Sequence, residues 1–206
     1  LKLVKAESKK YKKTIGLYPE TKHPSYFKSI GLPLEESLIK ELKKYGFNTK
    51  NSPVFIQSFE LGSLRKLKKL SSLPLIFLVD DPDKVPFDFV LEGKKTTYLE
   101  LIQPESLKEL SSWLAGIGPY KRYIVPVNAK GEKLPPTQLV EQAHTVGLLV
   151  YPYTFRSEDR YLHQDYKGDP ANEYLEFYKL GVDGVFSDFS DQAFKAREIF
   201  LKEIKK

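Results

Sequence analysis

Apolar and polar positions follow two different periods along the chain, and their succession predicts strands that alternate with helices. Short apolar runs typical of buried strands lie near residues 15, 55, 76, 117, 150 and 185. Stretches with apolar residues at helical spacing occupy residues 34–45, 63–70, 104–114, 135–146, 173–180 and 190–204. No hairpin signal joins two strands directly, so we expect parallel strands connected by crossover helices.

Two stretches depart from this rhythm. Residues 80–100 are polar and rich in turn residues, yet aromatic residues continue through them, which predicts an inserted loop rather than a linker. The run Gly116–Pro119 is short and glycine-rich, so as a strand it would approach another backbone closely. We also expect Pro135 and Pro136 to open a helix and Ser190 to cap the last one.

The order of elements favours one fold class. No glycine-rich phosphate loop follows an early strand, which argues against a doubly wound nucleotide-binding sheet. We therefore expect an α/β fold of the (β/α)8 TIM-barrel type, whose functional groups gather at the carboxyl ends of the strands. About six βα units are present, too few to close the barrel. We expect residues 1–206 to be the C-terminal part of a single barrel domain, with two units on an N-terminal segment outside this sequence.

Composition narrows the function classes. The formal net charge is +6, with lysines clustered at residues 9–13, at 66–69 and at the C-terminus. These clusters lie in stretches that we expect to be helical, and no aromatic–basic strand motif accompanies them, so we interpret them as solvated faces and expect no nucleic-acid partner. The absence of cysteine excludes disulfides, zinc–thiolate sites and thiol catalysis. No apolar run approaches the roughly 20 residues of a transmembrane segment.

The segment Ile15–Pro24 is the strongest candidate for chemistry, because an apolar run there ends in Glu20 and Lys22. Residues two apart in an extended chain share a face, so the carboxylate and the ammonium group would project together. Such a pair can hold a metal cation and an oxyanion, although a surface salt bridge is the alternative. Gln57 and Phe59 share a face at the end of the next strand, where they would contact a substrate or pack in the core.

Five motifs occur in order along the chain: GLYPETK at 16–22, VFIQSFE at 54–60, GIGP at 116–119, YPYTFRS at 151–157 and GVDGVFSDF at 181–189. Together they resemble the glycerophosphodiester phosphodiesterases, most closely the longer exported branch of that family. The resemblance implies hydrolysis of a small-molecule glycerophosphodiester to glycerol 3-phosphate and an alcohol, with Ca²⁺ or Mg²⁺ as cofactor. It also suggests a periplasmic or extracellular location.

The resemblance assigns roles to single residues. Glu20 matches a metal-ligating carboxylate, and Lys22 matches the cation placed against the substrate phosphate. Gln57 and Phe59 would contact the substrate. Tyr153 stands where shorter family members carry tryptophan, and would form an aromatic wall for the glycerol or pack in the core. For Arg156 we expect a loop-bracing role rather than a phosphate contact.

The chain also departs from the family pattern. The two catalytic histidines and two further acidic ligands of the family lie on its first two βα units, which this sequence does not contain. His23, His144 and His163 do not match them, so we expect no catalytic residue in this chain and no activity from the chain alone. Its own N-terminal segment would be the completing partner. The alternatives are a non-catalytic binding module for phosphorylated glycerol groups and a phospholipase-like relative with an apolar loop at Phe87–Phe89.

Overall fold

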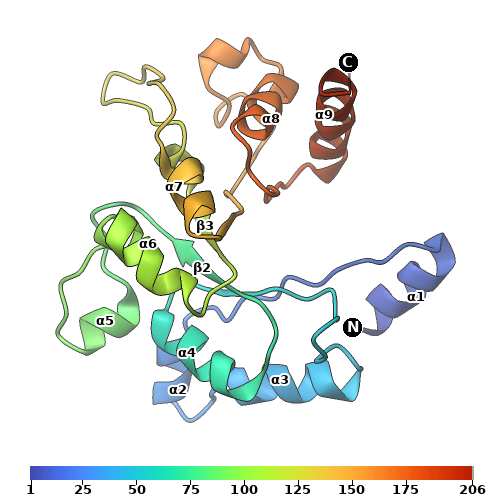
Figure 1. Ribbon diagram of the computed structural model, residues 1–206, viewed down its shortest axis with the longest axis vertical. Helices are drawn as coiled ribbons and strands as arrows, with labels where there is room; N and C mark the ends of the chain where they lie inside the picture. The colour runs from blue at the N-terminus through green and yellow to red at the C-terminus, as the bar shows by residue number, and fades with distance from the viewer. Residues whose placement is uncertain (206) are drawn as a thin grey trace. The chain divides into compact units, whose positions relative to one another are not determined.

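The computed structural model describes residues 1–205 and divides into two compact units, Leu1–Ala115 and Gly116–Lys206 (Figure 1). Each unit combines short parallel strands with helices and is described by itself. Within residues 1–205, no helix has the length and apolar character needed to cross a membrane.

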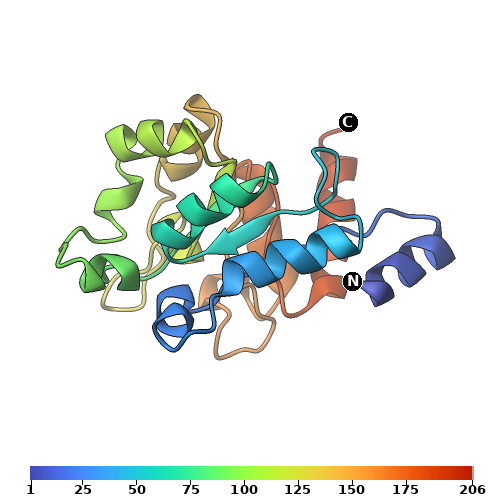
Figure 2. The same ribbon diagram turned by 90° about the horizontal axis from the view of Figure 1, so that it is seen from below.

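The first unit contains two strands, with helices before, between and after them. Its elements are α1 (Lys2–Tyr11), α2 (Pro24–Ser29), α3 (Leu34–Lys44), β1 (Ile56–Ser58), α4 (Leu61–Leu70), β2 (Leu75–Val79), α5 (Phe87–Leu91), the 3-10 turn η1 (Glu100–Ile102) and α6 (Pro104–Ser111). Helices α3 and α4 pack against each other (Figure 2). Every residue of β2 is buried, as its almost entirely apolar sequence requires.

The strands of the first unit are parallel and in a defined register. β1 pairs with β2, with Gln57 opposite Ile76. On the other side of β1, the isolated parallel bridges Leu17↔Val54 and Glu20↔Gln57 bring residues 17–20 alongside it. The segment around residue 17 therefore takes the place of a strand, as the sequence predicts, although only two bridges mark it.

The second unit repeats the pattern with β3 (Gly116–Pro119), the 3-10 turn η2 (Lys121–Tyr123), α7 (Leu139–Thr145), β4 (Leu149–Val150), the 3-10 turn η3 (Gln164–Tyr166), α8 (Pro170–Lys179) and α9 (Ser190–Glu203). β3 and β4 are parallel, and the parallel bridges Tyr120↔Tyr153 and Phe155↔Ser187 continue the ladder. A Cβ atom on Gly116 would collide with the carbonyl group of Leu149. This confirms the expected close approach of two backbones at the glycine-rich run.

Strand positions were easier to predict than helix ends. Each of the expected positions appears as a parallel strand or a parallel bridge. The expected loop at 80–100 was only partly right, since it contains α5 and η1. The helix predicted from Pro135 begins at Leu139, because Thr137 donates from N to the carbonyl of Ile124 at 2.8 Å and ties the preceding residues to a loop. Ser190 is not a cap, since Phe189 holds that position.

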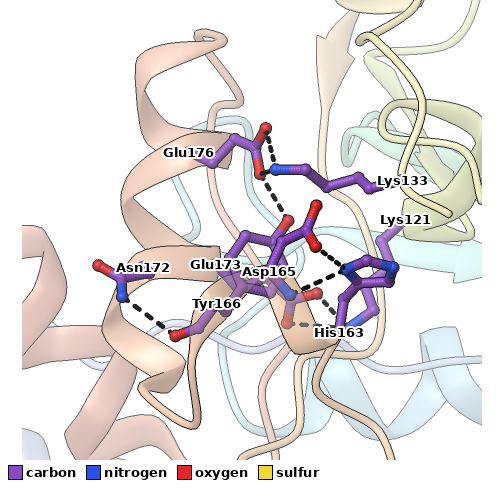
Figure 3. A network of polar contacts seen from close by, with 8 residues as sticks. All are labelled: Lys121, Lys133, His163, Asp165, Tyr166, Asn172, Glu173 and Glu176. Atoms are coloured by element: carbon purple, nitrogen blue, oxygen red, sulfur yellow. Dashed lines mark hydrogen bonds and ion pairs between the residues drawn. The ribbon is translucent and has the colours of Figure 1, made fainter.

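A network of ion pairs and hydrogen bonds joins the loops of the second unit to α8 (Figure 3). Lys121, directly after β3, donates from Nζ to both carboxylate oxygens of Glu173 at 2.7 and 2.9 Å. Lys133 donates to Glu176, which also accepts a hydrogen bond from the Tyr166 hydroxyl at 2.5 Å. The Lys121 and Glu173 side chains are only 4% and 2% exposed, and burial lowers the pKa of Lys121 although Glu173 opposes the shift.

We expect the Lys121–Glu173 pair to matter most when it is broken on one side. Glu173→Gln leaves a buried ammonium group without its counter-charge and should cost about 3–5 kcal/mol of unfolding free energy in a urea titration. Lys121→Met combined with Glu173→Leu should recover most of that loss, because neither charge is then buried. Lys133→Met, in a more exposed pair, is the control, and an equal loss in that variant would contradict the prediction.

Candidate functional site

The candidate site lies where residues 17–22 run past the carboxyl end of β1. Gln57 donates from its backbone N to the carbonyl of Pro19, and Thr21 donates to the carbonyl of Gln57, both at 3.0 Å. Glu20 and Gln57 are partners in this parallel ladder. Because partners in register present their side chains to the same face, Glu20 and Gln57 lie side by side.

Thr21 shows which way its neighbours face. Its hydroxyl lies 3.1 Å from that of Ser63 on α4, and the residue is only 2% exposed. In an extended segment the residues on either side point the other way. Glu20 and Lys22 therefore share the face turned away from α4, with Gln57 on the neighbouring strand.

Two oxygens on this face have unusual surroundings. Within residues 1–205, Oε1 of Glu20 and Oε1 of Gln57 are both buried and have no hydrogen-bond partner. Buried polar atoms are rarely left unpaired, and one explanation for such an atom is that it binds an ion. Carboxylate and amide oxygens are the donors that Ca²⁺ and Mg²⁺ prefer. The chemistry of this donor pair therefore fits a divalent cation.

Glu20 and Gln57 supply fewer oxygen ligands than a divalent cation needs. Ca²⁺ takes about six to eight oxygen ligands, and Mg²⁺ about six. In the part of the chain that the structure describes, no group of three or more histidine or acidic side chains is arranged to hold a metal. Glu20 and Gln57 can supply two ligands of such a site, and the remainder would have to come from water, substrate or another segment.

Lys22 lines a recess of about 320 Å³, which we call the strand-end recess. Its walls come from the segment after Glu20, the ends of β1 and β2, and α5: Lys22, His23, Phe59, Glu60, Asp80, Lys84, Val85, Phe87 and Tyr98. Phe59 meets Tyr98 edge to face, with ring centroids 6.4 Å apart. Within residues 1–205 Lys22 is exposed and makes no ion pair, so its ammonium group is available to an anion in this recess.

Two buried carboxyl groups fix the walls of the recess. Glu60 is 3% exposed, and its Oε2 accepts hydrogen bonds from the backbone N and the hydroxyl of Ser25 on α2. Asp88 of α5 is 6% exposed, and its Oδ2 accepts from the backbone N of Gly62 in the first turn of α4 at 2.7 Å. Burial raises the pKa of both carboxyl groups, and the nearby charge of Asp88 raises the pKa of Glu60 further.

The sequence did not single out this carboxyl pair. Glu60 is the last residue of the VFIQSFE motif, but neither its partner Ser25 nor the helix that carries Ser25 was predicted. Asp88 lies in a region expected to be loop, where the signal of a short helix was Pro86 followed by an acidic residue in the first turn. Because α5 was not predicted, the contact between Asp88 and Gly62 could not be predicted either.

Other predicted residues have clear structural surroundings. Arg156 lies within ion-pair distance of Glu158 and Asp188 and stacks on Tyr161, which confirms its expected loop-bracing role. His144 is on α7 and contacts Asp183 at 2.9 Å. Tyr153 is in the second unit, beside Tyr120 at a ring distance of 6.2 Å. Its role as a wall for glycerol stays a prediction.

His163 and His23 also occupy defined positions. His163 caps η3, where its Nδ1 accepts from the backbone N of Asp165, and its Nε2 lies 2.8 Å from the carbonyl of Gly131. His23 has a left-handed backbone with φ of 53° at the start of α2 and lines the strand-end recess. The expectation that His23 is not catalytic stays a prediction.

We expect the unpaired Glu20 oxygen to cost stability when no cation is present. Glu20→Met removes a carboxylate with one buried, unpaired oxygen and should raise the free energy of unfolding by about 1 kcal/mol in metal-free buffer. Millimolar Ca²⁺ should then stabilise the unaltered chain more than the variant, measured as a shift in urea midpoint. Glu41→Met, on the exposed face of α3, is the control. A loss of stability in Glu20→Met would show that the oxygen has a protein partner.

The raised pKa of Glu60 predicts a pH dependence of definite sign. Because the folded state binds this proton more readily than the unfolded state, the burial of Glu60 lowers stability at neutral pH, and this cost disappears as pH falls toward the ordinary value of 4.5. Relative to Glu60→Gln, the unaltered chain should therefore gain unfolding free energy between pH 7 and pH 5.

Glu36 supplies the opposite case in the same unit. A hydrogen bond from Lys66 lowers the pKa of Glu36, so its contribution should be lost as pH falls. Relative to Glu36→Gln, the unaltered chain should lose stability over the lower part of an acid titration. The difference in unfolding free energy between the unaltered chain and the variant should change with pH in opposite directions at Glu60 and Glu36. A change in the same direction at both positions would contradict the two pKa shifts.

Comparison with known proteins places this geometry in a family. The family model described as "Glycerophosphoryl diester phosphodiesterase family" matches residues 2–192. The chain is 34% identical over 200 residues to glycerophosphodiester phosphodiesterase GDPD6 of Arabidopsis thaliana, covering 91% of this chain and 52% of that protein. It is 27% identical over 204 residues to glycerophosphodiester phosphodiesterase of Haemophilus influenzae, covering 94% of this chain and 54% of the relative. The chain thus spans about half the length of these curated relatives.

Solved structures share the fold. A protein from Silicibacter pomeroyi described as a glycerophosphoryl diester phosphodiesterase matches with a TM-score of 0.62 at 18% identity, covering 95% of this chain and 54% of that chain. A glycerophosphodiester phosphodiesterase from Parabacteroides distasonis matches with a TM-score of 0.57 at 14% identity, covering 96% and 62%. These matches confirm the expected α/β fold class with parallel strands of the TIM-barrel type. The chain belongs to the glycerophosphoryl diester phosphodiesterase family.

Proposed function

We propose that this chain forms part of the active site of an enzyme that hydrolyses glycerophosphodiesters to glycerol 3-phosphate and an alcohol. The observation that supports the proposal is the shared face of Glu20, Gln57 and Lys22, which puts two unpaired buried oxygens next to an exposed ammonium group. A phosphodiester bound to a divalent cation needs both kinds of group.

Lys22 has the simplest role in this proposal. Its ammonium group enters the strand-end recess and would contact a non-bridging oxygen of the substrate phosphate. As a compact point charge, it stabilises the negative charge that builds on the phosphoryl oxygens during attack. Lys22 thereby orients the phosphate toward the face that carries Glu20.

Glu20 and Gln57 would hold the cation, Ca²⁺ or Mg²⁺, which when bound withdraws charge from the phosphoryl oxygens. The Glu20 carboxylate contributes a charged ligand, and the Gln57 amide oxygen a neutral one. Phe59 then closes the recess beside Lys22 and excludes water from one side of the phosphate.

The incomplete donor set favours a second candidate, a non-catalytic module that binds phosphorylated glycerol groups. Within residues 1–205, Glu20 belongs to no group of three or more acidic or histidine side chains that could hold a metal ion, so the chain by itself offers a binding face rather than a complete catalytic centre. In that case Lys22 and Phe59 would still hold phosphate and glycerol. The two candidates differ in whether turnover appears when further ligands are supplied.

Release of glycerol 3-phosphate from glycerophosphocholine tests the proposal. We expect no turnover by the chain alone. Co-expression with the portion of a family member that this chain does not span should give activity that requires Ca²⁺ or Mg²⁺. Lys22→Met should then lower kcat/KM by about 100-fold or more, a loss of about 2.7 kcal/mol in transition-state stabilisation. Lys28→Met on the neighbouring α2, which also removes one exposed lysine, should change it less than twofold.

The same assay separates the candidates. Binding of glycerol 3-phosphate to the supplemented chain without any turnover would favour the binding module. Turnover by the chain alone would contradict the proposal that further ligands are required. Equal losses in Lys22→Met and Lys28→Met would remove Lys22 from the site.

A further inference from the structure

A second recess in the first unit lies away from the face that carries Glu20, and we call it the lysine recess. Its volume is about 440 Å³, and its walls come from the second half of α1, the turn that follows, and the segments around residues 47 and 53: Lys5, Ser8, Lys9, Lys12, Lys13, Thr14, Ile15, Phe47 and Pro53. In Figures 1 and 2, α1 lies beside the chain that follows α3. Ile15 and Glu20 are five residues apart, about 16 Å in an extended chain.

The charge of the lysine recess is one-sided. Four of its lining residues are lysines, and none is acidic. Within residues 1–205, none of these four lysines makes an ion pair, whereas the neighbouring Lys10 pairs with Glu7 at 3.6 Å. Lys5 and Lys9 are one helical turn apart, a spacing at which like charges repel. The sequence therefore places uncompensated positive charge at one spot, and an anion there would relieve it.

The helix dipole does not account for this arrangement. A negative potential at the carboxyl end of α1 favours lysine in its last turn, which holds Lys9 and Lys10. Lys5 lies earlier in the helix and still converges on the same recess, with its Nζ 5.6 Å from the ring centroid of Phe47. Lys12 follows the helix with a left-handed backbone, φ 50°, which turns the chain back along the recess.

The recess also has a polar donor and an apolar floor. The Ser8 hydroxyl oxygen accepts a hydrogen bond from the backbone N of Ile15 at 3.1 Å, and its O–H group remains a donor. Phe47 is 8% exposed and forms part of the floor. The volume falls in the range of about 300–1,000 Å³ common for small-molecule sites. A ligand of that size with several negative charges matches what the walls offer.

We propose that the lysine recess binds a small anion carrying clustered phosphate groups. Four ammonium groups exceed what one inorganic phosphate can neutralise, so the ligand carries at least two phosphates close together. A free polyphosphate and a multiply phosphorylated lipid headgroup share this chemistry. The site is separate from the strand-end recess and does not depend on the proposed enzymatic function.

Titration calorimetry with the full 206-residue chain and inorganic tripolyphosphate tests the proposal. We expect saturable binding that weakens as salt rises, because the contacts are between exposed charges. Lys9→Gln with Lys13→Gln should lower the affinity by about tenfold or more, which corresponds to about 1.4 kcal/mol. Lys68→Gln with Lys69→Gln, near the end of α4, removes the same charge elsewhere and should change the affinity less than twofold.

Further arms locate the site and identify the source of the phosphates. In amide NMR spectra, tripolyphosphate should shift Ser8, Ile15 and Phe47 and leave Glu20 and Lys22 unchanged. Vesicles containing phosphatidylinositol bisphosphate that bind through Lys9 and Lys13 more tightly than tripolyphosphate does would support a lipid headgroup as the source. No saturable binding to either probe would overturn the proposal. So would equal binding of single phosphate and tripolyphosphate, or equal losses in the two double variants.

Discussion

The parallel ladder between residues 17–21 and β1 is the constraint on which the candidate site depends. Leu17 donates to the carbonyl of Pro53 at 2.8 Å, and Phe55 donates to the carbonyl of Leu17 at 3.0 Å. The same alternation continues through Gln57 and Thr21, so the register cannot slip by one residue without breaking the ladder. A slip would turn Glu20 toward α4 and Thr21 toward Gln57. The ladder thus converts spacing in the sequence into a chemical face.

Several polar groups around this face are buried at a cost in folding free energy, and they fix the positions of its side chains. Within residues 1–205, the Oε1 atoms of Glu20 and Gln57 lie buried without a hydrogen-bond partner, and the carboxyl groups of Glu60, which lines the recess, and of Asp88 on α5 are buried as well. The Glu60 carboxylate joins the start of α4 to α2, and the Asp88 carboxylate joins it to α5. These contacts hold the walls of the recess in place while Lys22 stays exposed. Unpaired or strained polar groups commonly mark functional sites, because evolution keeps them despite their cost.

The sequence predicted the parts of the fold that depend on a single short period. Gly116 predicted a close approach of two backbones, and the two-residue spacing predicted that Glu20 and Lys22 share one face. It did not predict contacts that need a third element. The pairing of Asp88 with Gly62 depends on α5, a helix of five residues, too short for a hydrophobic period to be visible. The Lys121–Glu173 pair joins residues 52 apart, which no local pattern records.

At the proposed site, Glu20 offers an unpaired oxygen to a cation while Lys22 faces the phosphate. A crystal of the chain soaked with Ca²⁺ and glycerol 3-phosphate measures this most directly. The account predicts a calcium ion about 2.3–2.6 Å from Glu20 Oε1 and a phosphate oxygen within hydrogen-bonding distance of Lys22 Nζ. A calcium ion bound elsewhere, with Glu20 Oε1 hydrogen-bonded to a protein group, would contradict it.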